Sequence, residues 1–258
     1  MKRIVLLCCC LLGLFACKSS FEKLLESGDR DEKYETAMDL FLAGKYLRAA
    51  QLFESLTLSV AGTPREDTVL YYWGLSNYRA KDYATAETNF EKFVESFPLS
   101  PFAESAAFMR LDCLSRSTYR YELDQTPTYR TITAISEYII AHPDTRHMAE
   151  CQAMLKELND RLDKKAYENA RLYYKMEDYK AARVAMKNIL KDDADNIYRE
   201  EILYYAAMSS YKYAQMSVRE KQKERFLVFV DDYFNFVSEY PESSRRKELD
   251  ALYAKVKK

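Results

Sequence analysis

Few side chains in this sequence are placed to do catalytic or ligand chemistry. The two histidines, His142 and His147, lie five positions apart around a proline, and no further ligands stand at metal-binding spacing. The chain has no serine-nucleophile elbow, no glycine-rich phosphate loop and no zinc-protease motif. We therefore expect the histidines in a solvent-exposed loop, and we predict no catalytic residue, no metal and no cofactor.

Carboxylates and thiols within the body of the chain lead to the same prediction. Adjacent carboxylates on a helix face different directions, so the pairs are expected to be solvated; they are Asp192 with Asp193 and Asp231 with Asp232. Cys113 and Cys151 lie in apolar helical contexts, where a buried thiol is the usual state, although one disulfide is compatible with the count. A hydrolase that uses one of these thiols with a histidine is an alternative that their apolar surroundings disfavour.

Cys17 stands apart because it ends a short apolar run that follows Lys2 and Arg3. The run, residues 4–16, would extend about 20 Å as a helix, against about 30 Å of bilayer hydrocarbon, so a signal peptide is favoured over a membrane span. The residues LFAC resemble the lipobox of bacterial lipoproteins. That resemblance implies cleavage after residue 16 and a covalent diacylglycerol on Cys17, usually with a further acyl chain such as palmitate. An ordinary signal peptide with an incidental cysteine is the alternative.

Composition indicates a helical, globular protein. Removal of residues 1–16 leaves 242 residues, with 37 basic and 40 acidic side chains and a formal net charge of −3, so no nucleic-acid-binding surface is predicted. Glycine and proline are scarce, at five and six, and long stretches are rich in Ala, Leu, Glu and Lys. The prolines fall at a few joints between segments with three- and four-residue apolar spacing, which is where a chain of packed helices tolerates them.

A repeat runs through these segments. Four small residues align, with a tyrosine three positions before each and an aromatic residue four positions after; the small residues are Ala37, Gly74, Ala170 and Ala207. In three units the match extends to a tyrosine, a second alanine and a large apolar residue; these are Tyr46, Ala49 and Phe53, then Tyr83, Ala86 and Phe90, then Tyr179, Ala182 and Met186. Small residues allow two helices of a hairpin to approach closely, and the large ones fill the space between successive hairpins.

The repeat resembles the tetratricopeptide repeat, and the resemblance implies an all-α solenoid of about five helical hairpins. The third hairpin is degenerate: residues 117–129 are expected to be an inserted loop and residues 131–141 its second helix. The fifth is stretched by the charged residues 212–224. A compact helical bundle is the alternative, but a bundle does not need columns in register.

Tetratricopeptide stacks expose the first helix of each hairpin on a concave face, so the aligned aromatic residues are predicted to line a groove for a peptide or a partner helix. In the N-terminal half, these candidate groove residues are Tyr34, Phe41, Tyr71, Tyr78 and Arg79. In the C-terminal half, the candidate partner-docking residues are Tyr167, Tyr174, Tyr204 and Tyr211. Some of these rings are expected to pack between repeats instead.

The combination of a lipobox, five repeats and the phrase FEKFVESFPLSP at residues 90–101 resembles the BamD family of lipoproteins of the outer-membrane β-barrel assembly machinery. The resemblance implies a non-enzymatic, outer-membrane scaffold that faces the periplasm. It implies that the N-terminal repeats receive unfolded outer-membrane proteins and that the C-terminal repeats dock the barrel-inserting subunit. The chain then divides into a signal peptide (1–16), a lipid-anchored linker (17–30), N-terminal repeats (31–145) and C-terminal repeats (146–258). A tetratricopeptide adaptor lipoprotein that organises cell-wall enzymes is the alternative function.

Overall fold

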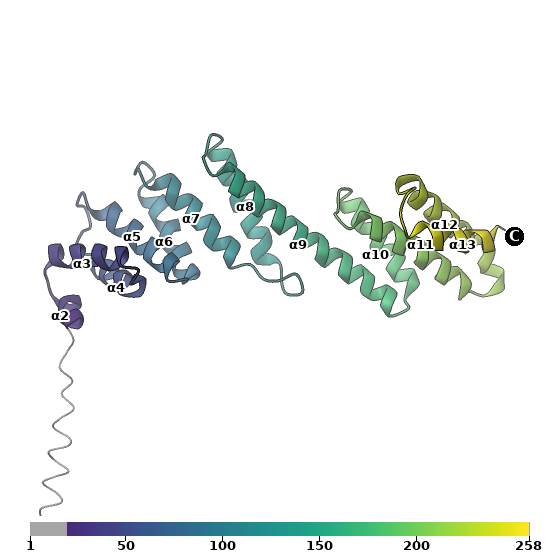
Figure 1. Cartoon of the computed structure of the whole chain (residues 1–258), viewed down its shortest axis with the longest axis horizontal. Helices are drawn as coiled ribbons and strands as arrows, with labels where there is room; N and C mark the ends of the chain where they lie inside the picture. The colour runs from purple at the N-terminus through teal and green to yellow at the C-terminus, as the bar shows by residue number, and fades with distance from the viewer. Residues whose placement is uncertain (1–19, 258) are drawn as a thin grey trace, which may run out of the picture. The chain divides into compact units, whose positions relative to one another are not determined.

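A computed structural model describes residues 20–257, and all regular secondary structure in this range is helical (Figure 1). The helices are α2 (Ser20–Glu26), α3 (Arg30–Leu42), α4 (Tyr46–Leu56), α5 (Glu66–Arg79), α6 (Tyr83–Ser96), α7 (Ala103–Arg116), α8 (Thr126–Ala141), α9 (Met148–Lys175), α10 (Tyr179–Asp192), α11 (Arg199–Gln215), α12 (Arg219–Glu239) and α13 (Arg246–Val256). The predicted all-α class is confirmed. Cys17 and the predicted signal peptide lie outside the described residues.

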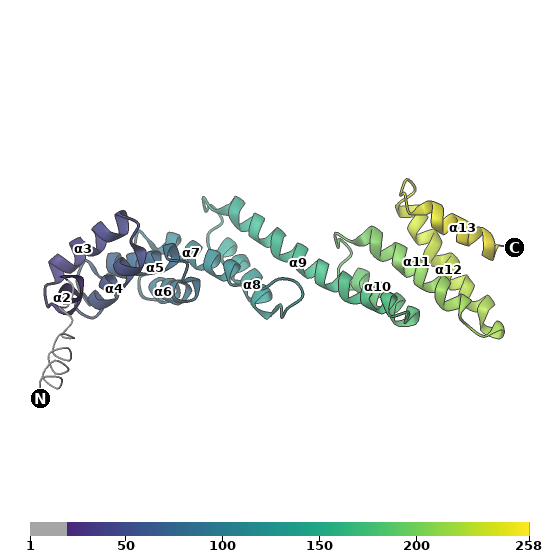
Figure 2. The same cartoon turned by 60° about the horizontal axis from the view of Figure 1, so that its bottom comes forward.

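The helices from α3 to α12 form five successive hairpins, as predicted, with α2 before them and α13 after them. The chain divides into two compact units: described residues up to Thr118 with Thr133–His147, and Tyr119–Ile132 with Met148 onward. Within the first unit α3 to α7 pack each on the next, and within the second unit α9 to α13 do the same. In the second unit α10, α11 and α12 lie side by side in both views (Figures 1 and 2). This nearest-neighbour packing is the arrangement of a helical repeat solenoid.

The small residues of the repeat lie where hairpins are tightest. Ala37, Ala170 and Ala207 are buried, and a Cβ atom added to Gly74 would stand 2.9 Å from Cε1 of Phe90 on the partner helix. The large residues that fill the space between hairpins, Phe53, Phe90 and Met186, are completely buried. The alanines of the second helices, Ala49, Ala86 and Ala182, are completely buried too. The packing role predicted for these columns is therefore confirmed.

A shared turn joins the two helices of three hairpins. Gly44, Lys81 and Glu177 occupy the same repeat position, and all three have a positive φ, at 74°, 67° and 63°. The next residue in two of these turns is an aspartate that caps the second helix: Asp82 accepts from the N–H of Thr85 at 3.1 Å, and Asp178 accepts from that of Ala181 at 3.0 Å. A residue with a left-handed backbone, followed directly by the N-cap residue, lets the chain reverse direction within a short turn.

The third hairpin differs from the sequence prediction. Its second helix, α8, begins at Thr126 instead of residue 131, so the inserted loop is residues 117–125. Asp124 starts the helix by accepting from the N–H of Thr126 at 3.3 Å and from its hydroxyl at 3.0 Å. Pro127 then falls in the first turn, where the missing N–H costs nothing. The proline that was interpreted as a joint is therefore part of the helix.

Lysine and arginine side chains of α9 hold this loop. Arg161 donates to the carbonyl of Tyr119 at 2.8 Å, and Lys165 donates to those of Tyr121 and Leu123 at 3.0 and 2.7 Å. The loop is thus fixed by hydrogen bonds from charged donors to backbone oxygens.

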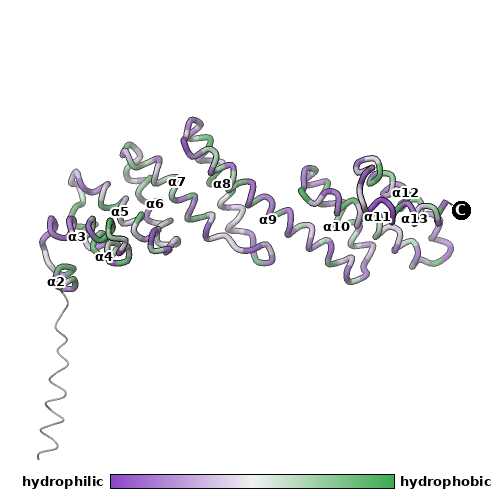
Figure 3. The backbone as a smooth tube through the Cα atoms, viewed as in Figure 1, coloured by the Kyte–Doolittle hydropathy of each residue, from purple (hydrophilic) through white to green (hydrophobic). Residues whose placement is uncertain are grey.

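Apolar and polar residues alternate in short stretches along every helix (Figure 3). Among residues 20–257, no helix combines the length and the apolar character that crossing a membrane requires.

Candidate peptide-binding surface

The tyrosines three positions before the small residues of the repeat, which we call the first column, pack against the helix hairpin that follows. The ring of Tyr71 stacks on Phe102 with centroids 4.5 Å apart, and the ring of Tyr167 stacks on Tyr198 at 4.8 Å. In each pair the second residue stands 31 positions later and is the N-cap of the next hairpin's first helix. The column therefore joins one hairpin to the next.

Tyr34 and Tyr204 also contact the N-cap residue of a later helix, and in both cases this residue is an arginine. Arg65 caps α5, stands 31 positions after Tyr34 and lies over its ring at 5.1 Å. Arg245 caps α13 and lies over the ring of Tyr204 at 4.9 Å, while the Tyr204 hydroxyl donates to Glu248 at 2.6 Å. Burial, and then the hydrogen bond to Glu248, raise the pKa of Tyr204. Both rings are thus held by a cation as well as by apolar contact, and Tyr204 is held by a carboxylate too.

The second column, the aromatic residues four positions after the small ones, packs inside its own hairpin and against the next one, since Phe41 also contacts Tyr72 and Tyr174 contacts Tyr205. Phe41, Tyr78 and Tyr174 each make an edge-to-face contact with the tyrosine five positions later, across the turn, at 5.5, 5.5 and 5.3 Å between centroids. Tyr78 also donates to Asp112 at 2.5 Å; burial, followed by this hydrogen bond, raises its pKa to about 12. Tyr211 instead packs on Phe229 at 5.2 Å.

Burial decides how much of each predicted residue a ligand is able to reach. Tyr71, Tyr167, Tyr204 and Tyr211 are at most 9% exposed, so their rings are mainly part of the core. Arg79 is exposed, and the other four predicted residues are partly exposed; these are Tyr34, Phe41, Tyr78 and Tyr174. A binding role for these residues remains a prediction, and the partly exposed rings are the ones available for it.

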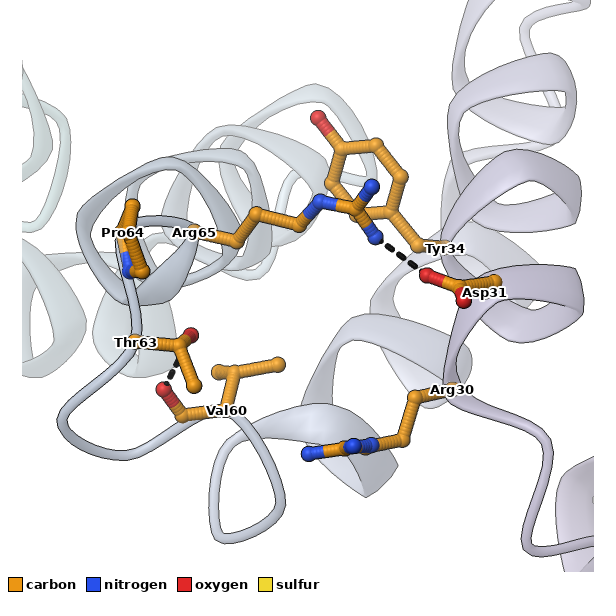
Figure 4. Close-up of a pocket in the computed structure, with 7 residues that line it drawn as sticks. All are labelled: Arg30, Asp31, Tyr34, Val60, Thr63, Pro64 and Arg65. Carbon is orange, nitrogen blue, oxygen red and sulfur yellow. Dashed lines mark hydrogen bonds and ion pairs between the residues drawn. The ribbon is translucent and has the colours of Figure 1, made fainter.

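Tyr34 lines a cavity. The cavity has a volume of about 270 Å³ and lies in the first unit between the start of α3 and the α4–α5 loop (Figure 4). Its walls are Arg30, Asp31, Tyr34, Val60, Thr63, Pro64 and Arg65. In Figure 4 the side chains of Arg30 and Arg65 enter from opposite sides of the opening.

The cavity combines two guanidinium groups with an apolar wall. Arg65 pairs with Asp31 at 2.5 Å, but both side chains are more than half exposed, so this ion pair stabilises the fold little. Arg30 donates to the carbonyl of Ser59 at 3.1 Å. With one carboxylate and two guanidiniums, the cavity has one excess positive charge beside the ring of Tyr34 and the side chain of Val60. It is suited to a carboxylate next to an apolar or aromatic side chain.

Sequence reasoning found Tyr34 but missed both arginines. Arg65 follows Tyr34 at the same spacing of 31 residues as Phe102 follows Tyr71, but that spacing acquires its meaning only from the contacts in the structure. Arg30 carried no repeat signal, since it precedes the first aligned residue of the first unit.

Asp232, predicted to be solvated, is instead 2% exposed. Arg183 donates to it from Nε at 2.6 Å and from Nη2 at 3.2 Å, Lys187 pairs with it at 2.8 Å, and Ser210 donates to it as well. Burial alone would raise the pKa of Asp232, but these hydrogen bonds outweigh burial, and its pKa lies below the ordinary value. The carboxylate lies on the same helical face as Phe229, Tyr233 and Phe236, whereas Asp231 is exposed as predicted.

The histidines were also predicted to be solvent-exposed, and the structure contradicts this. His147 is partly buried and stacks on Phe108 with centroids 3.8 Å apart, and His142 packs on Tyr138 at 4.8 Å. Aromatic packing on α7 and α8 accounts for both positions. In residues 20–257, no three histidine, cysteine, aspartate or glutamate side chains gather in a way that would hold a metal ion.

Cys113 and Cys151 are free, buried thiols, which confirms the expectation for both. Burial, followed by the charge of Asp112, raises the pKa of Cys113 to about 12, and burial also raises that of Cys151. A nucleophilic cysteine needs the opposite shift, since the thiolate is the reactive form. The thiols thus give no support to a hydrolase.

Comparison with known proteins gives one family. Residues 26–227 match the model of the YfiO family, described as an outer membrane lipoprotein. The outer membrane protein assembly factor BamD of Caulobacter vibrioides is 20% identical over 171 residues, which are 66% of this chain and 56% of that protein. A solved thermophilic TPR protein of Thermus thermophilus is 14% identical, with a TM-score of 0.33, over 88% of this chain and 100% of its own.

Proposed function

Because this chain belongs to the YfiO family of outer membrane lipoproteins, we propose that it is a non-enzymatic scaffold of outer-membrane β-barrel assembly. In this proposal Cys17 carries the lipid that anchors the chain to the outer membrane, with the helical repeats in the periplasm. The first unit binds unfolded outer-membrane proteins, and the C-terminal repeats dock the barrel-inserting subunit.

One observation supports client binding most directly: the cavity beside Tyr34 offers an aromatic ring, an apolar wall and an excess guanidinium charge on one open surface. An unfolded chain presents apolar side chains and carboxylates without fixed geometry. A cavity with both kinds of contact captures such segments without requiring a folded epitope.

Photocrosslinking of an unfolded outer-membrane protein to the purified lipoprotein tests client binding. Arg65→Gln removes the charge and leaves a shorter polar side chain, and we expect it to reduce crosslinking by about tenfold or more, as for loss of one charge-assisted hydrogen bond. Lys92→Gln is the matched control, since Lys92 is an exposed cation of α6 in the same unit, away from the cavity. Equal crosslinking by both variants would exclude the cavity as the client site.

Alanine at Tyr71 is a poorer test of binding. Its ring is 9% exposed and stacks on Phe102, and its hydroxyl is 2.8 Å from Oγ of Ser105. Truncation would therefore loosen the contact between two hairpins, and reduced crosslinking would not distinguish binding from folding.

Affinity purification of the membrane-anchored protein tests the assembly role. Recovery of the large barrel-inserting subunit is expected. Recovery of cell-wall synthases or hydrolases in its place, with outer-membrane barrels maturing normally after depletion, would favour the adaptor alternative.

Membrane fractionation of Cys17→Ala tests the anchor, because a variant that stays in the membrane fraction would refute Cys17 as the only attachment.

A further inference from the structure

The turns of the first two hairpins form an exposed edge, and Arg79 is the one residue of it that is also a candidate for the client groove. Its apolar members, Leu42 and Leu47, are 77% and 69% exposed on either side of the α3–α4 turn. Its charged members are Lys45, Arg48, Arg79 and Lys81, and all four side chains are exposed. We call these six residues the hairpin-turn edge. Exposed apolar side chains occur elsewhere on the chain, so it is the grouping of two leucines with four cations that distinguishes this edge.

A cavity opens on this edge between the two turns. It has a volume of about 490 Å³, and Lys45, Tyr46, Leu47 and Arg48 line one side of it, with Ala80 from the second turn. Tyr46 is partly buried here against Phe41. The cavity is therefore lined both by apolar side chains and by the two cations Lys45 and Arg48.

The positive charge of the hairpin-turn edge is not neutralised by ion pairs with carboxylates of the described residues. Within residues 20–257, no ion pair involves Lys45, Arg48, Arg79 or Lys81. The carboxylate next to Lys81, that of Asp82, is occupied as the N-cap of α6. Four exposed cations that form no ion pair within the described residues make the edge a site for anions.

The start of the chain limits how far this edge can lie from the membrane. Phe21, Leu24 and Leu25 of α2 pack against the core formed with α3 and α4, and the guanidinium of Arg48 lies over the ring of Phe21 at 5.3 Å. Cys17 is four residues before Phe21, and four residues span at most about 14 Å when fully extended. A lipid on Cys17 therefore holds the N-terminal end of α4 within about one headgroup layer of the bilayer.

We propose that the hairpin-turn edge rests on the membrane surface, with its cations on the phosphates of anionic lipid headgroups and Leu42 and Leu47 in the acyl boundary. The inference rests on the lipid anchor of the proposed function, and it adds a second attachment that orients the first unit. A lipid chain alone would leave the unit free to rotate about its tether. Two attachments hold α4 with its N-terminal end on the membrane and its C-terminal end in water.

The two ends of α4 provide a matched pair of probe positions. Leu47 stands in its first turn and Leu58 lies just past its end, at 92% exposure, so the two are about 15 Å apart along the helix. Leu47→Cys and Leu58→Cys are each labelled with an environment-sensitive fluorophore on the mature lipidated chain. Cys113 and Cys151 are buried and do not compete for the label.

The labelled proteins are reconstituted into vesicles of phosphatidylcholine and phosphatidylglycerol in equal parts. The Leu47→Cys label is expected to shift its emission to shorter wavelength and to be quenched by spin-labelled lipid. The Leu58→Cys label is expected to stay in water. Vesicles of phosphatidylcholine alone, or high salt, should weaken the effect at Leu47→Cys, because screening reduces the attraction of surface cations.

Charge removal gives the quantitative test. Each cation near an anionic surface favours the docked state about fivefold, so Lys45→Gln with Arg48→Gln should lower the ratio of docked to undocked states by about tenfold to thirtyfold. Lys92→Gln, an exposed cation outside the edge, should change this ratio by less than about twofold.

Two failures are distinguishable. If the chain does not float with the vesicles, the lipid anchor is refuted and this inference falls with it. If the chain floats but the Leu47→Cys label stays in water, or if the Leu58→Cys label enters the lipid, the anchor stands and this inference alone is overturned.

Discussion

At the scale of single residues, the contact between Gly74 and Phe90 sets the distance between two helices. A Cβ atom at position 74 would lie 2.9 Å from the Phe90 ring, so the ring must move if alanine is introduced. Alanine favours a helix by about 1 kcal/mol over glycine, but overpacking costs about 1–3 kcal/mol. We expect Gly74→Ala to lower the free energy of unfolding by about 1 kcal/mol in urea titrations.

Phe90→Leu gives this prediction a rescue. With the smaller side chain, the space for a Cβ atom is available, so Gly74→Ala in the Phe90→Leu background should be neutral or stabilising. Gly28→Ala is the control, because nothing lies within 4 Å of the position of its added Cβ atom. Additive effects of the two substitutions would contradict a direct contact.

Asp232 is a second residue whose substitution is expected to change the stability of the fold. Its pKa is lowered in the folded protein, so its ionised form stabilises the fold above the ordinary value of 3.8, and this contribution is lost as the pH falls through the folded pKa. Asp232→Asn should cost about 2–4 kcal/mol at neutral pH, since it leaves Arg183 and Lys187 without their carboxylate. Below pH 3.8 the difference from the unmodified protein should shrink.

Urea midpoints at several pH values measure this difference. Asp231→Asn is the matched control, because Asp231 is the exposed neighbour and its substitution should shift the midpoint little at any pH. A constant difference between Asp232→Asn and the unmodified protein from neutral pH down to pH 3 would show that the carboxylate does not act through its charge.

At the scale of elements, the hairpin turns show how well a local motif predicts structure. Gly44, Lys81 and Glu177 share a left-handed backbone, but only glycine adopts it without strain. Lys81→Gly is expected to raise the free energy of unfolding by about 0.5–1 kcal/mol, and Gly44→Lys to lower it by a similar amount. If urea titrations give both variants the stability of the unmodified protein, the turn is not strained.

Local repetition predicted helices, hairpins and turns because each depends on neighbours in sequence. The small residues of the repeat and the residues of the shared turn recur with their physical causes, namely close helix approach and chain reversal. The repetition predicted which residues pack between hairpins, but not the partner that each of them contacts. The partner of Tyr71 is Phe102, 31 residues away, and its identity depends on how one hairpin rotates on the next.

The burial of Asp232 was predictable but was overlooked. Phe229, Tyr233 and Phe236 stand three residues before, one after and four after it, which places Asp232 on the apolar face of α12. A carboxylate on such a face requires cations from a neighbouring helix, and Arg183 and Lys187 stand four residues apart on α10. Adjacent charges on a helix therefore need to be assigned to faces one by one.

At the scale of the whole molecule, each compact unit has its own apolar clusters. Phe90 and Cys113 belong to one cluster of the first unit, and Tyr167 and Met186 belong to one of the second. Repeat proteins gain stability from each repeat and its nearest neighbours, so a local substitution need not weaken the entire chain equally. The two buried thiols report on this, because Cys113 lies in the first unit and Cys151 in the second.

Thiol labelling across a urea titration, assigned to each cysteine by mass spectrometry, measures how the units open. Gly74→Ala loosens the cluster that contains Cys113, so we expect Cys113 to react at lower urea while Cys151 keeps its midpoint. Asp232→Asn weakens the second unit and should have the reverse effect. The unmodified protein is the reference for both midpoints. If either substitution shifts both midpoints together, the chain unfolds as a single cooperative body, and the stability of a client-binding unit cannot be varied without that of the docking unit.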